Sequence, residues 1–325
     1  MPSTMGRLRR RLLTPSVTET LLDTRGFHKK TPEAQQLLET IGRRFLEGYG
    51  HAMAAGTTAE AEARLEAIPE RFRGFAYEGA GMAYAVLDGL PGGGRNGVGR
   101  LLAGRGGAHI YMVYVGIGWA MGRLPRFRWA DVEALDPLLR WLVLDGYGFH
   151  QAYFRTDRYV HRQYRDERFP WPAHDFPDYT GRAIDQGIGR ALWFVCGTDP
   201  GLVATTIETF PETRRSDLYS GAGLAATYAG GGDETELMVL REKAGPHRDA
   251  LAQGSAFAAE ARLRAGLLVP HTATATRVLC GLEPEEAARI PQEVRPRETG
   301  TGSLPAYELW RQAIAERIAA QTERR

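Results

Sequence analysis

Residues 77–89 read YEGAGMAYAVLDG, and two further stretches of the chain repeat their pattern. Residues 144–154 read LDGYGFHQAYF, and residues 219–230 read YSGAGLAATYAG. Each stretch sets a G-x-G before a helix-like run, beside a tyrosine or an acid. Glycine inside a helix costs about 1 kcal/mol relative to alanine, so its recurrence indicates a geometric purpose. We expect these helices to pack tightly against one another or around a common axis; the alternative is that the glycines open a concavity for a ligand.

The pattern belongs to an internal duplication. Residues 68–89 align without a gap with residues 210–231, which places Pro69 with Pro211 and Tyr77 with Tyr219. A second recurring signal, I-G followed by Arg or Trp, begins at Ile41, Ile117 and Ile188. Together the two signals indicate a repeat of about seventy residues, each made of an I-G helix, a connector and a G-x-G helix.

The expected fold is therefore mainly α, an internally duplicated helical-repeat architecture built from helix pairs. A few short strands remain an alternative, above all at residues 108–119, where AHIYMVYVGIGW is rich in β-branched and aromatic residues. We divide the chain into a basic N-terminal lead (1–30), a first repeat half (31–169), a Pro- and aromatic-rich connector (170–180), a second repeat half (181–295), and a linker with a C-terminal amphipathic helix (296–325).

Composition narrows the class of protein. The net charge of +2 favours neither nucleic acid nor an acidic partner, so we expect no nucleic-acid binding. No stretch approaches the roughly 20 apolar residues that a transmembrane helix needs, although the basic N-terminus is compatible with weak peripheral membrane contact. Cys196 and Cys280 both lie in apolar stretches of the sequence, which favours reduced thiols in the core and a cytoplasmic location.

Two groups of side chains are candidates for chemistry. The first is His150, Tyr153 and Asp157, in which His150 and Tyr153 share a helix face with Gly146. The second is Tyr77 and Glu78, directly before the first G-x-G. Imidazole and carboxylate groups suit general acid–base catalysis, while structural hydrogen bonds and the helix dipole are the competing explanations.

Metal and cofactor signatures are weak. The region contains no H-E-x-x-H or comparable pattern, so we expect no metal, and the sequence identifies no cofactor. Gly92, Gly94 and Gly97 form a formal G-x-G-x-x-G. A dinucleotide site needs a strand directly before this motif, whereas a helix-like segment and Pro91 precede it here, so we expect a surface loop.

Several stretches resemble a family of uncharacterised actinobacterial proteins encoded in enediyne antibiotic gene clusters. They are MGRLRRRLLTPS, ERFRGFAYEGAGMAYAVLDGL, AHIYMVYVGIGWAMGRLPRFRW, DPLLRWLVLDGYGFHQAYF and YSGAGLAATYAG. In those clusters the family lies beside the iterative polyketide synthase and its thioesterase. The resemblance implies a role in converting the polyketide polyene into the enediyne core, but it supplies neither a reaction nor catalytic residues.

We therefore expect an enzyme or essential accessory protein of enediyne biosynthesis, with an apolar polyene or enediyne-type small molecule and other pathway proteins as partners. One alternative is a non-catalytic polyene-binding or scaffold protein of helical-repeat type, favoured by the lack of a recognised catalytic motif. The other is a self-resistance protein that sequesters the finished product. Whether the protein is catalytic is left open by the sequence.

Overall fold

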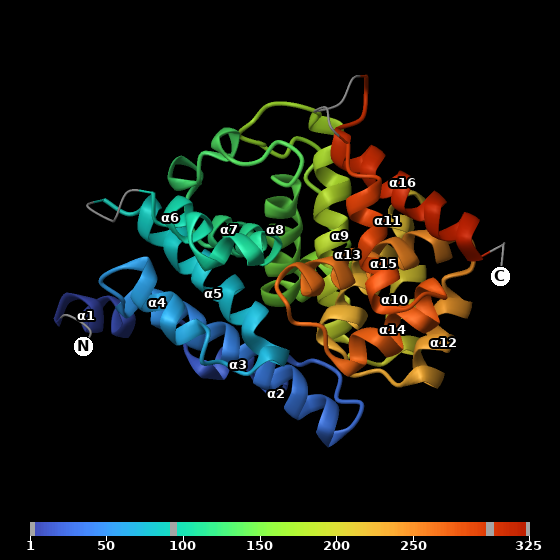
Figure 1. The fold of residues 1–325 in the computed structure, drawn as a ribbon, viewed down its shortest axis with the longest axis horizontal. Helices are drawn as coiled ribbons and strands as arrows, with labels where there is room; N and C mark the ends of the chain where they lie inside the picture. Colours follow the sequence, from blue (N-terminus) through green and yellow to red (C-terminus); the bar gives the residue numbers. More distant parts are fainter. Residues whose placement is uncertain (1–3, 92–95, 297–301, 323–325) are drawn as a thin grey trace.

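The computed structural model describes residues 4–91, 96–296 and 302–322, and across them the chain is all-α with no strand (Figure 1). Its α-helices are α1 (Thr4–Leu13), α2 (Leu22–Arg25), α3 (Pro32–Ala54), α4 (Thr58–Leu65), α5 (Glu70–Gly89), α6 (Gly97–Ala103), α7 (Ile110–Met121), α8 (Trp141–Phe154), α9 (Thr180–Val195), α10 (Pro200–Glu208), α11 (Glu212–Ala229), α12 (Glu234–Lys243), α13 (Arg248–Arg264), α14 (Pro270–Cys280), α15 (Pro284–Glu293) and α16 (Ala306–Thr322). Short helical turns are η1 (Val17–Thr20), η2 (Arg105–His109), η3 (Arg126–Arg128), η4 (Val132–Ala134), the π-turn η5 (Asp157–His161), η6 (Pro177–Tyr179) and η7 (Gly245–His247).

The prediction of a mainly helical fold is confirmed, and the strand alternative is wrong at residues 108–119. That stretch forms the end of η2 and the helix α7, whose side chains are buried nearly all round. Burial on every side removes the amphipathic pattern by which helices are usually recognised, so β-branched content alone misleads. The glycine-rich motif that includes Gly92 and Gly94 lies partly outside the described residues, as does part of the 296–325 linker.

Local signals fix where the first long helices begin. Thr31 caps α3, its Oγ1 accepting a hydrogen bond from the backbone N–H of Ala34 at 3.1 Å, and Pro32 occupies the first turn. Thr57 caps α4 in the same way, accepting from the backbone N–H of Glu60.

Seven long helices, α3, α5, α7, α8, α9, α11 and α13, pack side by side in chain order, and glycines make each contact close. A Cβ built on Gly48 of α3 would lie 2.0 Å from the Ala76 carbonyl oxygen of α5, and one on Gly79 of α5 would lie 2.0 Å from the Phe45 carbonyl oxygen of α3. The same reciprocal contact joins Gly81 to Gly116, Gly118 to Gly146, Gly148 to Gly187, Gly189 to Gly221, and Gly223 to Gly254. In every pair the carbonyl lies three residues before the partner glycine.

Helix geometry explains why the spacing is G-x-G. Successive side chains are about 100° apart around a helix, so two glycines separated by one residue lie about 200° apart, on opposite flanks. In α5, Gly79 therefore contacts the preceding helix α3 while Gly81 contacts the following helix α7. The glycines serve packing, as their recurrence predicted, and one G-x-G helix follows another along the chain.

The first member of the series differs from the sequence alignment. Gly42, which follows Ile41, lies against the side chain of Thr20, whereas Gly48 makes the contact with α5. The I-G signal at Ile41 is therefore not equivalent to those at Ile117 and Ile188. Each seventy-residue repeat contains two G-x-G helices.

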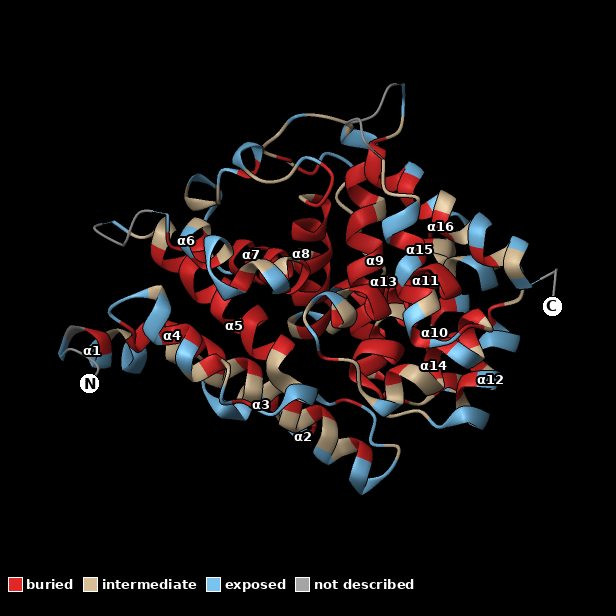
Figure 2. Ribbon diagram, in the orientation of Figure 1, coloured by how far each residue is buried: buried red, intermediate tan, exposed pale blue. Residues whose placement is uncertain are grey.

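The helices lying on either side of the predicted connector at residues 170–180 are in contact. Gly148 of α8 and Gly187 of α9 approach each other's backbone as closely as the other glycine pairs do. The helices α7, α8 and α9 are almost entirely buried, while the shorter helices α1, α2 and α12 carry exposed faces (Figure 2). In α1, the exposed side chains include Leu8 and Leu12.

Candidate functional site

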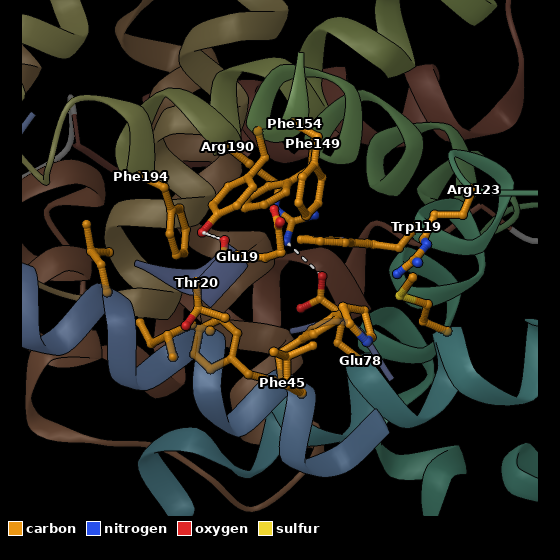
Figure 3. A pocket seen from close by; sticks show the side chains of 18 residues that line it. Glu19, Thr20, Phe45, Glu78, Trp119, Arg123, Phe149, Phe154, Arg190 and Phe194 are labelled. Carbon is orange, nitrogen blue, oxygen red and sulfur yellow. Dashed lines mark hydrogen bonds and ion pairs between the residues drawn. The ribbon is translucent and has the colours of Figure 1, made fainter. Parts of the chain in front are cut away.

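An apolar pocket opens between the N-terminal segment and the helices α3, α5, α7, α8 and α9 (Figure 3). The space between its side chains, including open solvent at its mouth, totals about 690 Å³, but the centre of a water-sized sphere fits in only about 70 Å³ of it, so the pocket is narrow. Its aromatic lining is Phe45, Phe75, Trp119, Phe149, Tyr153, Phe154 and Phe194, and its polar lining is Glu19, Thr20, Glu78, Arg123 and Arg190. Leu38, Ile41, Leu46 and Met82 supply aliphatic surface.

The aromatic side chains form one connected wall. The ring centroids of Phe45 and Trp119 are 4.6 Å apart, those of Trp119 and Phe149 are 5.2 Å apart, and those of Phe149 and Phe194 are 5.2 Å apart. Rings at these separations hold one another in place. The wall is therefore a preformed surface suited to a flat, apolar ligand.

The register of the G-x-G motif explains which side chains face inward. The residue before the first glycine and the residue after the second are four positions apart, so they share a helix face about equally removed from both glycine flanks. In α5 these residues are Glu78 and Met82, and in α8 they are Asp145 and Phe149. The inward positions that line this pocket or a second cavity beside it are Glu78, Met82, Val115, Trp119, Asp145, Phe149, Arg190, Leu224 and Phe257.

A buried charged cluster joins three helices at the pocket wall. Arg190 donates to Asp145 in a close ion pair, and its Nη2 lies 3.9 Å from Glu78 Oε1. Gln186 donates to Asp145 Oδ2 at 2.8 Å and to the Tyr307 hydroxyl at 3.1 Å. Two carboxyl groups thus share one guanidinium, and Asp145 holds the closer contact.

This arrangement leaves Glu78 as the weakly paired acid. Burial raises the pKa of the Glu78 carboxyl to about 7; Arg190 opposes the shift, and Asp145 adds to it. A carboxyl group with a pKa near the working pH can both donate and accept a proton. Glu78 is therefore placed for general acid–base chemistry against a ligand on the aromatic wall.

The structure brings two of the five predicted site residues to the pocket. Glu78 and Tyr153 both line it, and the Tyr153 hydroxyl donates to the Glu19 carbonyl oxygen at 3.5 Å. His150 lies behind the wall, with its ring edge-on to Trp119 and its Nδ1 without a hydrogen-bond partner. Burial lowers the pKa of His150 to about 3, helped by the nearby Arg123 and Arg155, so the imidazole is neutral.

The other two predicted residues lie elsewhere. The Tyr77 hydroxyl donates to Glu66 Oε1 at 2.6 Å, and its ring stacks on His109 at 3.8 Å between centroids. Burial and Glu66 raise the pKa of Tyr77. Asp157 is exposed and pairs with Arg162 on the π-turn after α8.

Three residues of the site, Asp145, Arg190 and Trp119, were not predicted from the sequence. A usable signal exists, because Asp145 directly precedes Gly146, and Arg190 and Trp119 directly follow Gly189 and Gly118. Charged residues at these inward positions are unusual inside helices that are otherwise apolar or small. Placing the residues around each G-x-G on a helical wheel identifies this face.

No group of three or more His, Cys, Asp or Glu side chains in the part of the chain that the structure describes is placed to hold a metal ion. Cys196 and Cys280 are buried free thiols, and burial raises the pKa of each to about 12. Neither cysteine lines the pocket. Within the described residues, every helix is too short or too polar to cross a membrane.

Comparison with known proteins gives one match. The model of a family described as "Protein of unknown function (DUF1702)" matches residues 4–318, nearly the whole chain. No curated protein and no solved structure matches.

Proposed function

This chain belongs to the DUF1702 family of proteins of unknown function, and from its pocket we propose that it acts on an apolar, conjugated chain. We place this role in enediyne antibiotic biosynthesis, where the protein helps to mature the polyketide polyene into the enediyne core. The pathway assignment is supported by the sequence resemblance described above. The chemical assignment is supported by the pocket.

The observation that carries the proposal is the combination of an aromatic wall with one acid of raised pKa. A linear polyene is flat and apolar, so it gains from burial against rings such as those of Trp119 and Phe149. Glu78 is the pocket group that exchanges a proton near neutral pH. Protonation of a conjugated chain at one carbon and deprotonation at another move its double bonds with no change in oxidation state, and this is the step that we assign to Glu78.

Binding is tested first. Purified protein is titrated with a linear polyene, and quenching of tryptophan fluorescence reports occupancy of the pocket next to Trp119. Phe154→Ala is expected to weaken binding about tenfold, because this partly exposed ring lines the pocket at a modest cost in stability. The matched control is Phe127→Ala, since Phe127 is 80% exposed and lies outside the pocket. Equal affinity of wild type and Phe154→Ala contradicts the assignment of the pocket.

Catalysis is tested second, with the pathway's other enzymes supplying the polyene. Glu78→Gln keeps the shape of the side chain and removes the exchangeable proton, so product formation is expected to fall by about 10²–10⁴-fold while binding persists. Asp157→Asn, at an exposed acid, serves as the control. Unchanged product with Glu78→Gln shows that the protein is a binding or scaffold component rather than an acid–base enzyme. Protection of DNA from the mature enediyne by the wild-type protein indicates the self-resistance role instead.

A further inference from the structure

Three buried hydrogen-bond donors in the walls of the pocket and of the second cavity beside it have no partner among the described residues. They are the indole Nε1 of Trp119, the guanidinium Nε of Arg190 and the hydroxyl of Tyr228. An indole N–H and an Arg Nε–H can only donate, and a tyrosine hydroxyl donates readily. Leaving such a group unsatisfied costs about 1–3 kcal/mol, so three in one place call for an explanation.

Trp119 and Arg190 adjoin the Glu78 carboxyl group, and Tyr228 lies in the second cavity, which Arg190 also lines. The second cavity is a small space of about 20 Å³. A Cβ built on Gly74 would lie 1.8 Å from the Tyr228 hydroxyl oxygen, and Gly74 precedes Glu78 by one turn of α5. Trp119 faces Glu78 closely enough to favour its ionised form, although the indole has no hydrogen bond by geometry.

None of the three donor atoms makes a hydrogen bond of normal geometry to the residues that the structure describes. The Arg190–Glu78 separation of 3.9 Å exceeds hydrogen-bonding distance and suits one intervening polar atom. That atom must accept several hydrogen bonds, which an oxygen with two lone pairs does well. Apolar carbon at this point would leave all three donors unsatisfied.

The charges around this site favour a neutral ligand oxygen over a negatively charged one. Arg190 already neutralises Asp145, and Glu78 is a second acid beside the same guanidinium. A ligand carboxylate would place a third negative group around one cation in a buried site, which is costly. A neutral carbonyl oxygen accepts the same hydrogen bonds without that cost, and it accepts from Glu78 as well when this group is protonated.

Resting on the proposed function, we propose that the chain bound in the pocket carries a neutral carbonyl group, such as a ketone, aldehyde or thioester, whose oxygen lies between Glu78, Arg190, Trp119 and Tyr228. The conjugated part of the ligand then extends outward along the aromatic wall. The cluster fixes the direction of the chain and draws electron density toward the carbonyl oxygen. Glu78 is thereby positioned to exchange a proton with the polarised conjugated system.

The test compares three linear probes of equal length: a tetraenal, the corresponding tetraene hydrocarbon, and the tetraenoate. Fluorescence titration of the full chain is expected to give about tenfold tighter binding of the aldehyde than of the hydrocarbon, with the carboxylate weaker than the aldehyde. Tyr228→Phe and Trp119→Phe each remove one donor while keeping an aromatic ring, and each is expected to reduce the preference for aldehyde over hydrocarbon severalfold. Because Trp119→Phe also removes the tryptophan that reports binding, its affinities are measured by equilibrium dialysis. The carbonyl stretching frequency of the bound aldehyde, measured by Raman spectroscopy, is expected to be lower in wild type than in Tyr228→Phe.

The control is Tyr84→Phe, which removes another buried, unpartnered hydroxyl in a different part of the molecule. It is expected to leave both the preference and the frequency unchanged, which separates hydrogen bonding at the cluster from a general effect on stability. Equal binding of aldehyde and hydrocarbon by wild type overturns the carbonyl inference and leaves the proposed function intact. Tighter binding of the carboxylate than of the aldehyde also overturns it. Failure of all probes to bind the folded protein overturns both.

Discussion

Two glycines of α3, separated by a single residue, have very different surroundings. An added Cβ at Gly48 meets the backbone of Ala76 at 2.0 Å, whereas one at Gly50 meets only the flexible side chain of Arg10, at 3.1 Å. Gly48→Ala is therefore expected to lower the free energy of unfolding by about 3 kcal/mol, because α3 and α5 must separate to admit the methyl group. Urea denaturation followed by circular dichroism measures the change.

Gly50→Ala is the matched control in the same helix. Alanine favours helix by about 1 kcal/mol over glycine, and Arg10 can move aside, so the free energy of unfolding is expected to stay within about 1 kcal/mol of wild type. A similar loss for both variants would mean that helix backbone contact is not what the G-x-G motif provides.

Glu78 makes the stability of the protein depend on pH. Its pKa is about 7 in the folded state and about 4.5 when the chain is unfolded, so folding favours the protonated form. Its contribution to stability is complete below pH 4.5 and is lost as the pH rises through 7. The loss amounts to about 3 kcal/mol, because each tenfold difference in proton affinity between the folded and unfolded states is worth about 1.4 kcal/mol.

Glu78→Gln removes this contribution. The difference in free energy of unfolding between the variant and wild type is therefore expected to grow in favour of the variant from pH 4.5 to pH 7 and to level off above pH 7. Denaturation of both proteins at a series of pH values measures this difference and cancels the titration of other groups. A difference that does not change with pH would place the carboxyl group in contact with solvent or in a tight ion pair.

Among the elements, the C-terminal helix α16 is attached through buried charges. Arg311 donates to Asp217 Oδ1 at 2.7 Å and to Glu308 Oε2 at 3.0 Å, while the partly exposed Arg182 pairs with the same two acids. Arg311→Leu leaves two buried carboxylates with one cation, so a loss of about 3–5 kcal/mol in the free energy of unfolding is expected. Thermal or urea denaturation measures it.

Arg317, also on α16, provides the comparison. It pairs with Glu293 at 3.1 Å, with about half of each side chain exposed, and Arg317→Leu is expected to cost less than about 1 kcal/mol. If Arg311→Leu and Arg317→Leu lowered the free energy of unfolding equally, the charges around Arg311 would be solvated in the folded protein.

The sequence predicts a structural feature well when the residues that produce the feature lie close together in the chain. The close packing of the G-x-G helices follows from glycines a few positions apart, so the sequence was enough to predict it. The helix α7 was ambiguous because it is buried on all sides and shows no periodicity. The ion pair between Asp145 and Arg190 joins residues 45 positions apart, and that pairing depends on the packing of α8 against α9.

The same distinction applies to the candidate site. Glu78 and Tyr153 were predicted as site residues from their neighbours in the sequence. Tyr77 and Asp157, which lie away from the pocket, were predicted in the same way. The register of the G-x-G separates Glu78 from Tyr77, because only Glu78 occupies an inward position. Tyr153 and Asp157 lie beyond the motif, so only the three-dimensional packing separates them. The ion-pair partners of Arg190 could be assigned only from the structure, because Glu78 and Asp145 lie on two other helices.

At the scale of the whole molecule, the series of glycine contacts runs without a break from α3 to α13. The contact between Gly148 and Gly187 joins the helices before and after the 170–180 connector as closely as any other pair, and the Glu78–Arg190 ion pair also links α5 to α9. Because each helix supports the next and charged groups cross between them, we expect a single cooperative unit. Urea unfolding is then expected to show one transition, with far-ultraviolet circular dichroism and tryptophan fluorescence coinciding.

Gly148→Ala sharpens this test at the junction itself. A Cβ on Gly148 would lie 2.1 Å from the Ile184 carbonyl oxygen, so the variant strains only the contact between α8 and α9. If the molecule is one unit, both probes shift together to lower urea concentration. If residues 31–169 and 181–295 are instead separate domains, the variant unfolds in two transitions, with tryptophans such as Trp119 and Trp193 reporting different midpoints. If both probes shift together, the pocket forms only when the two halves fold together, because its walls come from α3, α5, α7, α8 and α9.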